Sequence, residues 1–231
     1  MAEIQRRTRA DKGAIRLNRR DLFALEWIYD MEAIFEADIP VLLDPAKPIT
    51  RNAVRAVVRR WENAGLVEAE HAVTYQGRLI HVTPAGRRLV IRAELDTMPT
   101  VVPPVLGDLH RALVSRARLR IEERGVAEAS VDEWVSTRRW RLENAVPVRH
   151  EMPEPDGLLY LNDSTISVVL LCHTITEIQR LHSFLSVLAA EYPKVLLVVP
   201  QELLTRTREL IFGAWVTVLG NSGDSLHIVI I

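Results

Sequence analysis

Hydrophobic residues near the start of the chain recur with the spacing of amphipathic helices. The spacing predicts helices over residues 18–29, 36–43 and 50–63. The two longer helices each begin at a residue that caps helices well, Asn18 and Thr50. Three helices in close succession, separated by short connections, are therefore expected in the first part of the chain.

A change to short strand-like runs follows the third helix. Leu66–Glu70 and Leu79–Thr83 read as two strands with a turn at Gly77 between them, and Pro84 starts a last helix that runs to about Leu95. Helix, helix, helix, hairpin and helix is the element order of a winged helix-turn-helix. We assign such a domain to residues 18–97.

The remaining elements alternate between helical and strand-like periods. Three prolines between Met98 and Gly107 predict a stiff linker over 98–107, which separates the first domain from a mixed α/β domain over 108–231. The fold class expected for the whole chain is therefore α+β. In the second domain we expect helices over 109–123, 176–192 and 201–212, and strands over 131–137, 157–161, 165–172, 194–199, 215–219 and 226–231. For residues 134–143 a helix is the alternative.

Composition excludes several classes of protein. Hydrophobic residues make up 48% of the chain and charged residues 26%, which is typical of a globular protein. Cys172 is the only cysteine, so a disulfide framework within one chain is impossible, and a reducing cytoplasm is the expected location. No apolar run is long enough to span a bilayer, so we expect no membrane partner.

The charge is distributed unevenly, although the net charge is only −1. The first 93 residues hold 16 basic and 12 acidic side chains, whereas the rest hold 13 and 18. Residues 1–17 are basic and lack an apolar period, so they read as a flexible arm. This asymmetry favours contact between the first domain and a polyanion.

The third predicted helix carries the clearest candidate binding surface. Its apolar positions Val54, Val58 and Trp61 form one stripe, and arginines and an asparagine lie outside that stripe. Arginine and asparagine suit the edges of guanine and adenine in the major groove of double-stranded DNA. The alternative is that these arginines only solvate an exposed helix. The predicted DNA-binding residues are Thr50, Arg51, Asn52, Arg55, Arg59, Arg60, Arg78, Arg19 and Arg20.

A family resemblance extends this interpretation. The run from Asn52 through Gly65-Leu66-Val67-Glu68 to Thr83-Pro84-Ala85-Gly86 resembles the winged helix of many bacterial regulators, and Pro155-Asp156-Gly157 matches a motif in the second half. With these segments the chain resembles the replication-relaxation family of plasmid and mobile-element proteins. The resemblance implies a restriction-endonuclease-like second domain and a role in transcription regulation or in replication and maintenance of a mobile element.

The nuclease chemistry that the resemblance implies is incomplete. Such nucleases hold Mg²⁺ with several carboxylates and place a lysine nearby. Here the strand after the hairpin reads Val169, Leu170, Leu171, Cys172 and His173, which leaves Asp156 as a lone acid. We therefore predict no catalytic residue, no metal ligand and no cofactor, and interpret Asp156 as a turn residue before glycine. Only the alternative function, a divergent metal-dependent nuclease, would use Asp156 and Mg²⁺.

A second domain without catalytic residues would still contain many apolar residues. We expect it to form a homodimer, because many winged helix proteins read two half-sites as dimers. Binding of a partner protein, as in an antitoxin-like repressor, is the competing interpretation.

Overall fold

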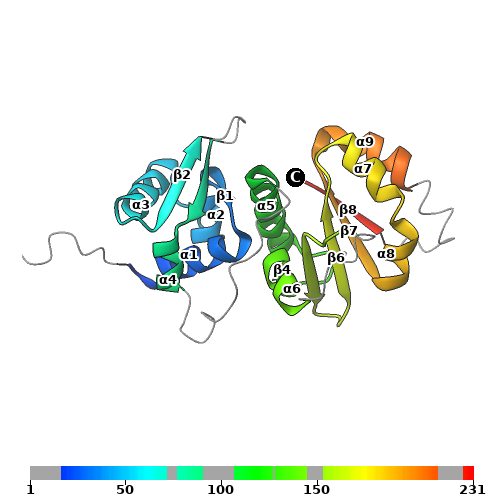
Figure 1. Ribbon diagram of the computed structural model, residues 1–231, viewed down its shortest axis with the longest axis horizontal. Coiled ribbons are helices and arrows are strands. Elements are labelled where there is room, and N and C mark those ends of the chain that lie inside the picture. The colour runs from blue at the N-terminus through cyan, green and yellow to red at the C-terminus, as the bar shows by residue number, and fades with distance from the viewer. Residues whose placement is uncertain (1–16, 72–76, 91–106, 127, 145–152, 213–225) are drawn as a thin grey trace, which may run out of the picture.

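Two β-sheets organise the chain, which we describe from a computed structural model covering residues 17–71, 77–90, 107–126, 128–144, 153–212 and 226–231. A three-stranded sheet lies on one side of the molecule and a five-stranded sheet on the other, with the long helix α5 between them (Figure 1). The fold is α+β, as expected. No helix in the described part of the chain is both long and apolar enough to cross a membrane.

The first half contains the three helices and the hairpin that the periodicity predicts. Asn18 and Thr50 do cap the two long helices, because their side-chain oxygens accept hydrogen bonds from the backbone of Asp21 (2.9 Å) and Ala53 (3.3 Å). The sheet order is β1-β3-β2, and both pairings are antiparallel. The elements are α1 (Arg19–Met31), β1 (Ile34–Phe35), a 3-10 turn (Glu36–Asp38), α2 (Ile39–Leu43), α3 (Arg51–Asn63), β2 (Val67–His71), β3 (Arg78–Val82) and α4 (Pro84–Val90).

Two glycines are required at particular positions of this half. Gly65 follows α3 with φ +66°, a conformation that glycine adopts without strain. A side chain at Gly86 would place its Cβ 2.2 Å from the backbone oxygen of Leu66, so α4 packs directly on the chain that enters β2.

The second half is a mixed sheet in the order β4-β5-β6-β7-β8. Strands β4, β5 and β6 are antiparallel neighbours, whereas β6, β7 and β8 run parallel. The elements are α5 (Asp108–Arg124), β4 (Val131–Ser136), α6 (Thr137–Glu143), β5 (Gly157–Leu161), β6 (Ile166–Leu171), α7 (Ile175–His182), α8 (Leu185–Glu191), β7 (Lys194–Val199), a 3-10 turn (Gln201–Leu203), α9 (Leu204–Thr207), a π-helical turn (Arg208–Phe212) and β8 (Leu226–Ile230).

One predicted helix is wrong. The segment 176–192 forms two helices, because the chain tightens at Ser183 and Phe184, whose backbone N–H groups bond to the carbonyls three residues earlier, Arg180 and Leu181. The predicted strand 215–219, residues 98–106 of the linker and residues 1–16 of the basic arm lie outside the described residues.

Helix α5 is shared by both halves. Facing the first half, Arg116 forms an ion pair with Asp38 (2.8 Å), and Ser115 donates a hydrogen bond to the backbone oxygen of Ala33. One continuous cluster of buried side chains joins α1, α3 and β3 to α5 and to one face of the five-stranded sheet. Helices α7 and α8 cover the opposite face of that sheet.

Candidate nucleic-acid interface

The exposed face of α3 has the composition that the sequence predicts. Val54, Val58 and Trp61 are at most 2% exposed and fix one side of the helix in the core. The side away from the core presents Asn52, Arg55 and Arg59, and Arg51 lies in the first turn; all four are exposed. Within the described residues, none of these three arginines takes part in an ion pair, so their guanidinium groups face solvent.

Arg60 makes a contact that the sequence did not predict. Its guanidinium forms an ion pair with Asp21 of α1, which is only 2% exposed. The indole Nε1 of Trp61 donates to the same carboxylate oxygen at 3.1 Å. Arg60 therefore ties α3 to α1, while its side chain is 41% exposed.

Arg78, on β3, also makes contacts that the sequence did not predict. Its guanidinium pairs with Glu36 (2.9 Å) and Glu62 (3.0 Å), and its side chain is 24% exposed. The hydrogen bond to Glu36, with the charges of both carboxylates, raises the pKa of Arg78 further above its ordinary value. Arg78 thus stabilises the packing of β3 against α3, because Glu36 and Glu62, which lie far apart in sequence, both pair with it.

A surface cleft separates α3 from the hairpin. Its volume is about 470 Å³, and basic side chains of α3 line one wall. The lining residues are Glu36, Arg55, Arg59, Glu62, His71, Gly77 and Arg78. The two acids in this cleft are the partners of Arg78, so their charge is partly balanced beside the exposed arginines.

The remaining predicted DNA-binding residues lie at the N-terminal ends of helices. The Thr50 hydroxyl caps α3, so it orients the helix that carries the arginines. Arg19 and Arg20 are exposed in the first turn of α1. That turn neighbours the end of α3 through the contact between Asp21 and Arg60.

Asp156 lies at a bend directly before Gly157, as the sequence suggested, but its carboxylate is buried. It is 5% exposed, one carboxylate oxygen lies 2.7 Å from Nε2 of His110, and the other accepts a hydrogen bond from the backbone of Leu171 at 2.6 Å. The pairing could not be predicted from sequence, because His110 lies on α5, 46 residues earlier, and no local pattern links the two residues.

Further polar side chains gather beside His110. The ring of His173, which follows β6, lies 5.6 Å from the His110 ring between centroids. Glu177, on α7, approaches Nδ1 of His173 to 3.2 Å. Sequence reasoning missed this cluster, and the only local signal was the four-residue spacing of His173 and Glu177 at the start of a helix.

The electrostatics of this cluster depend on burial and on two carboxylates. Burial, the largest single influence, lowers the pKa of His110, but the hydrogen bond and charge of Asp156 with the charge of Glu177 outweigh it and raise the pKa. Burial and the same two charges raise the pKa of the Cys172 thiol to about 12. Cys172 is therefore a protonated, buried thiol at neutral pH, and not a nucleophile.

No family model, no curated protein and no solved structure matches the chain.

Proposed function

We propose that this protein binds double-stranded DNA by placing α3 in the major groove. The observation that carries the proposal is the exposure of Asn52, Arg55 and Arg59 on a helix whose opposite face is buried, with Arg51 exposed in its first turn. A helix fits the major groove, arginine pairs with guanine edges or phosphates, and asparagine pairs with adenine. The buried face holds these side chains in a defined orientation, as a reading surface requires.

The surroundings of α3 support this proposal. Its first turn presents backbone N–H groups toward solvent, which favours a phosphate at that end. Glu36 and Glu62 are paired with Arg78, so they repel a DNA backbone less than isolated acids would.

The biological role that we propose follows the family resemblance. The protein would act as a transcriptional regulator or as a replication or maintenance factor of a plasmid or other mobile element, in the cytoplasm and as a homodimer on paired half-sites. We do not extend the proposal to DNA cleavage, because β6 carries Val169, Leu170 and Leu171 where a second carboxylate is required, and Asp156 is occupied by His110.

The test is a DNA titration with the double variant Arg55→Ala/Arg59→Ala. Binding to a labelled duplex of mixed sequence, followed by fluorescence anisotropy, should weaken at least about tenfold, because two phosphate or base contacts are lost. The slope of log affinity against log salt concentration should become shallower by about two.

A charge-matched control separates this surface from net charge. Arg180→Ala/Arg206→Ala removes two exposed arginines from the second half and should leave affinity nearly unchanged. Equal affinity of the wild type and the Arg55/Arg59 variant would refute the proposal, provided that circular dichroism shows both to be folded. The stoichiometry of the same titration tests for a dimer.

A further inference from the structure

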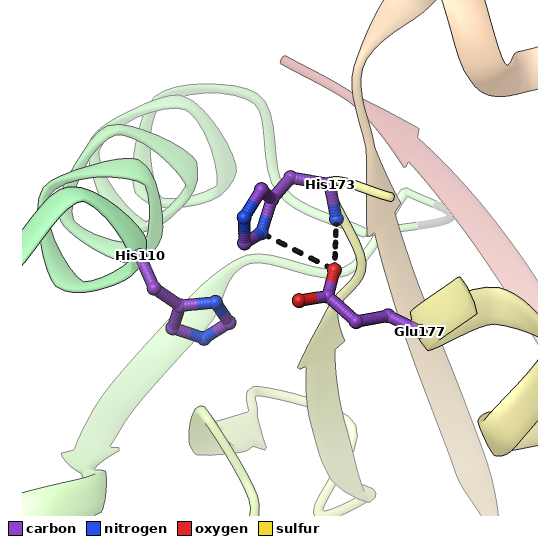
Figure 2. Close-up of side chains that lie close together, drawn as sticks. All are labelled: His110, His173 and Glu177. Carbon is purple, nitrogen blue, oxygen red and sulfur yellow. Dashed lines mark hydrogen bonds and ion pairs between the residues drawn. The ribbon is translucent and has the colours of Figure 1, made fainter. Parts of the chain in front are cut away.

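Three metal-binding side chains meet where α5 approaches the end of β6. His110 comes from α5, His173 from the residues after β6, and Glu177 from the first turn of α7. Figure 2 shows the two imidazole rings and the carboxylate turned toward one another. A ligand atom from each of the three lies within 4.8 Å of the others.

His110 is arranged as a metal ligand would be. Its Nε2 is engaged with Asp156 at 2.7 Å, which leaves Nδ1 as the nitrogen available for a further partner. His110 is only 7% exposed, and within the described residues its Nδ1 has no hydrogen-bond partner. A buried imidazole nitrogen without a partner is costly unless something binds it. A carboxylate on the far nitrogen is the arrangement that fixes the tautomer of metal-binding histidines.

Glu177 is held in place by the backbone. Its Oε2 accepts hydrogen bonds from the N–H groups of His173 (2.8 Å) and Thr174 (3.0 Å), which fixes the carboxylate beside the His173 ring. The Nδ1 of His173 is likewise buried and makes no hydrogen bond within the described residues, although it lies 3.2 Å from that carboxylate. The side chains of His173 and Glu177 are 27% and 32% exposed, so an ion can enter from solvent.

We propose that His110, His173 and Glu177 bind a divalent transition-metal ion, Zn²⁺, while Asp156 orients His110. Two imidazoles and one carboxylate are a ligand set that suits zinc and that leaves a fourth position for water. Two nitrogen ligands disfavour Mg²⁺, which takes oxygen ligands. Tetrahedral ligands at zinc bond lengths lie about 3.4 Å apart. Nδ1 of His173 and the carboxylate of Glu177 are already 3.2 Å apart.

This site is distinct from the nuclease metal site that the resemblance implied. That site would use Asp156 as a direct ligand with acids on β6, whereas here Asp156 acts only through His110. The proposal is also independent of DNA binding by α3, so either proposal can fail alone.

The test uses the full chain without a polyhistidine tag, stripped with a chelator and titrated with Zn²⁺ in a calorimeter. One equivalent should bind. His173→Ala and Glu177→Gln should each weaken binding at least about tenfold, and glutamine retains the helix cap because its side chain can still accept the backbone bonds. Titration with Co²⁺ should give the intense visible absorption of a tetrahedral complex, and His173→Ala should abolish that absorption.

Two histidine controls make the assignment specific. His81 belongs to a second group of candidate ligands, with Glu70 and Asp108, that contains only one histidine and exposed acids. His81→Ala and the exposed His182→Ala should therefore both bind Zn²⁺ like the wild type. Absence of stoichiometric binding, loss of binding in His81→Ala, or retention of full affinity in folded His173→Ala would each overturn the proposal.

Discussion

The carboxylate of Asp21 makes contacts with three other residues of the first half. One of its oxygens accepts from both Arg60 and Trp61, and the other accepts from the backbone of Asn18 at 3.0 Å. A buried carboxylate is tolerated because each oxygen has a donor. The same residue therefore caps α1 and fixes the end of α3 against it.

His110 gives a prediction about pH. Because its pKa is raised in the folded protein, His110 stabilises the metal-free protein fully below the unfolded value of 6.5, and this contribution is lost as the pH rises through the raised value. His110→Gln should remove that contribution. Urea unfolding of chelator-treated protein should show a larger loss of stability in the variant at about pH 5.5 than at about pH 8.5. An equal loss at both pH values would contradict the prediction.

Arg55, Arg59 and Arg60 show which properties of a residue can be predicted from sequence and which cannot. The period of the apolar stripe predicts that Arg55 and Arg59 are exposed, and they are. It cannot show that Arg60 meets Asp21, because that contact spans 39 residues and depends on how α1 crosses α3. The pairing of His110 with Asp156 was unpredictable for the same reason.

At the scale of elements, the start of α3 is set by Thr50. Its hydroxyl satisfies the backbone N–H of Ala53, which has no partner within the helix. Thr50→Ala should lower the free energy of unfolding by about 1 kcal/mol, whereas Thr50→Ser, which retains the hydroxyl, should lower it by less than about 0.5 kcal/mol. Urea denaturation followed by circular dichroism measures both, and equal losses would show that the cap is unimportant.

The ends of helices and strands could be predicted from sequence where a capping residue or a turn residue marks them. Both capped helices begin where Asn18 and Thr50 place them, and the hairpin strands β5 and β6 flank the turn at Asn162-Asp163. Strand β1 was missed because two residues are too few for a period. The break at Ser183 was missed because the apolar spacing continues across it.

At the scale of the molecule, Arg118 of α5 lies between the two halves. Its guanidinium pairs with Asp30 (3.2 Å) and Glu122 (2.7 Å). It also lies over the rings of Trp27, from the first half, and Trp134, from the second, at 5.0 and 5.7 Å. The planar guanidinium suits stacking on both rings, so Arg118 connects parts of the core that the linker separates in sequence.

Arg118→Ala should therefore destabilise the whole protein. We expect the free energy of unfolding to fall by about 2–4 kcal/mol, because Asp30 loses a partner and both rings lose a cation. The matched change Arg206→Ala removes a pair whose side chains are 69% and 55% exposed, and it should cost less than about 0.5 kcal/mol. Similar losses in the two variants would contradict this role.

The continuous core around α5 has a mechanical consequence. A protein with a hinge between its halves can bind DNA with one half while the other reorients, but here α5 is packed against both. If α3 binds in the major groove as proposed, the five-stranded sheet would project at one fixed angle from the duplex axis. Bending of the DNA would then rotate both halves together, as one rigid body.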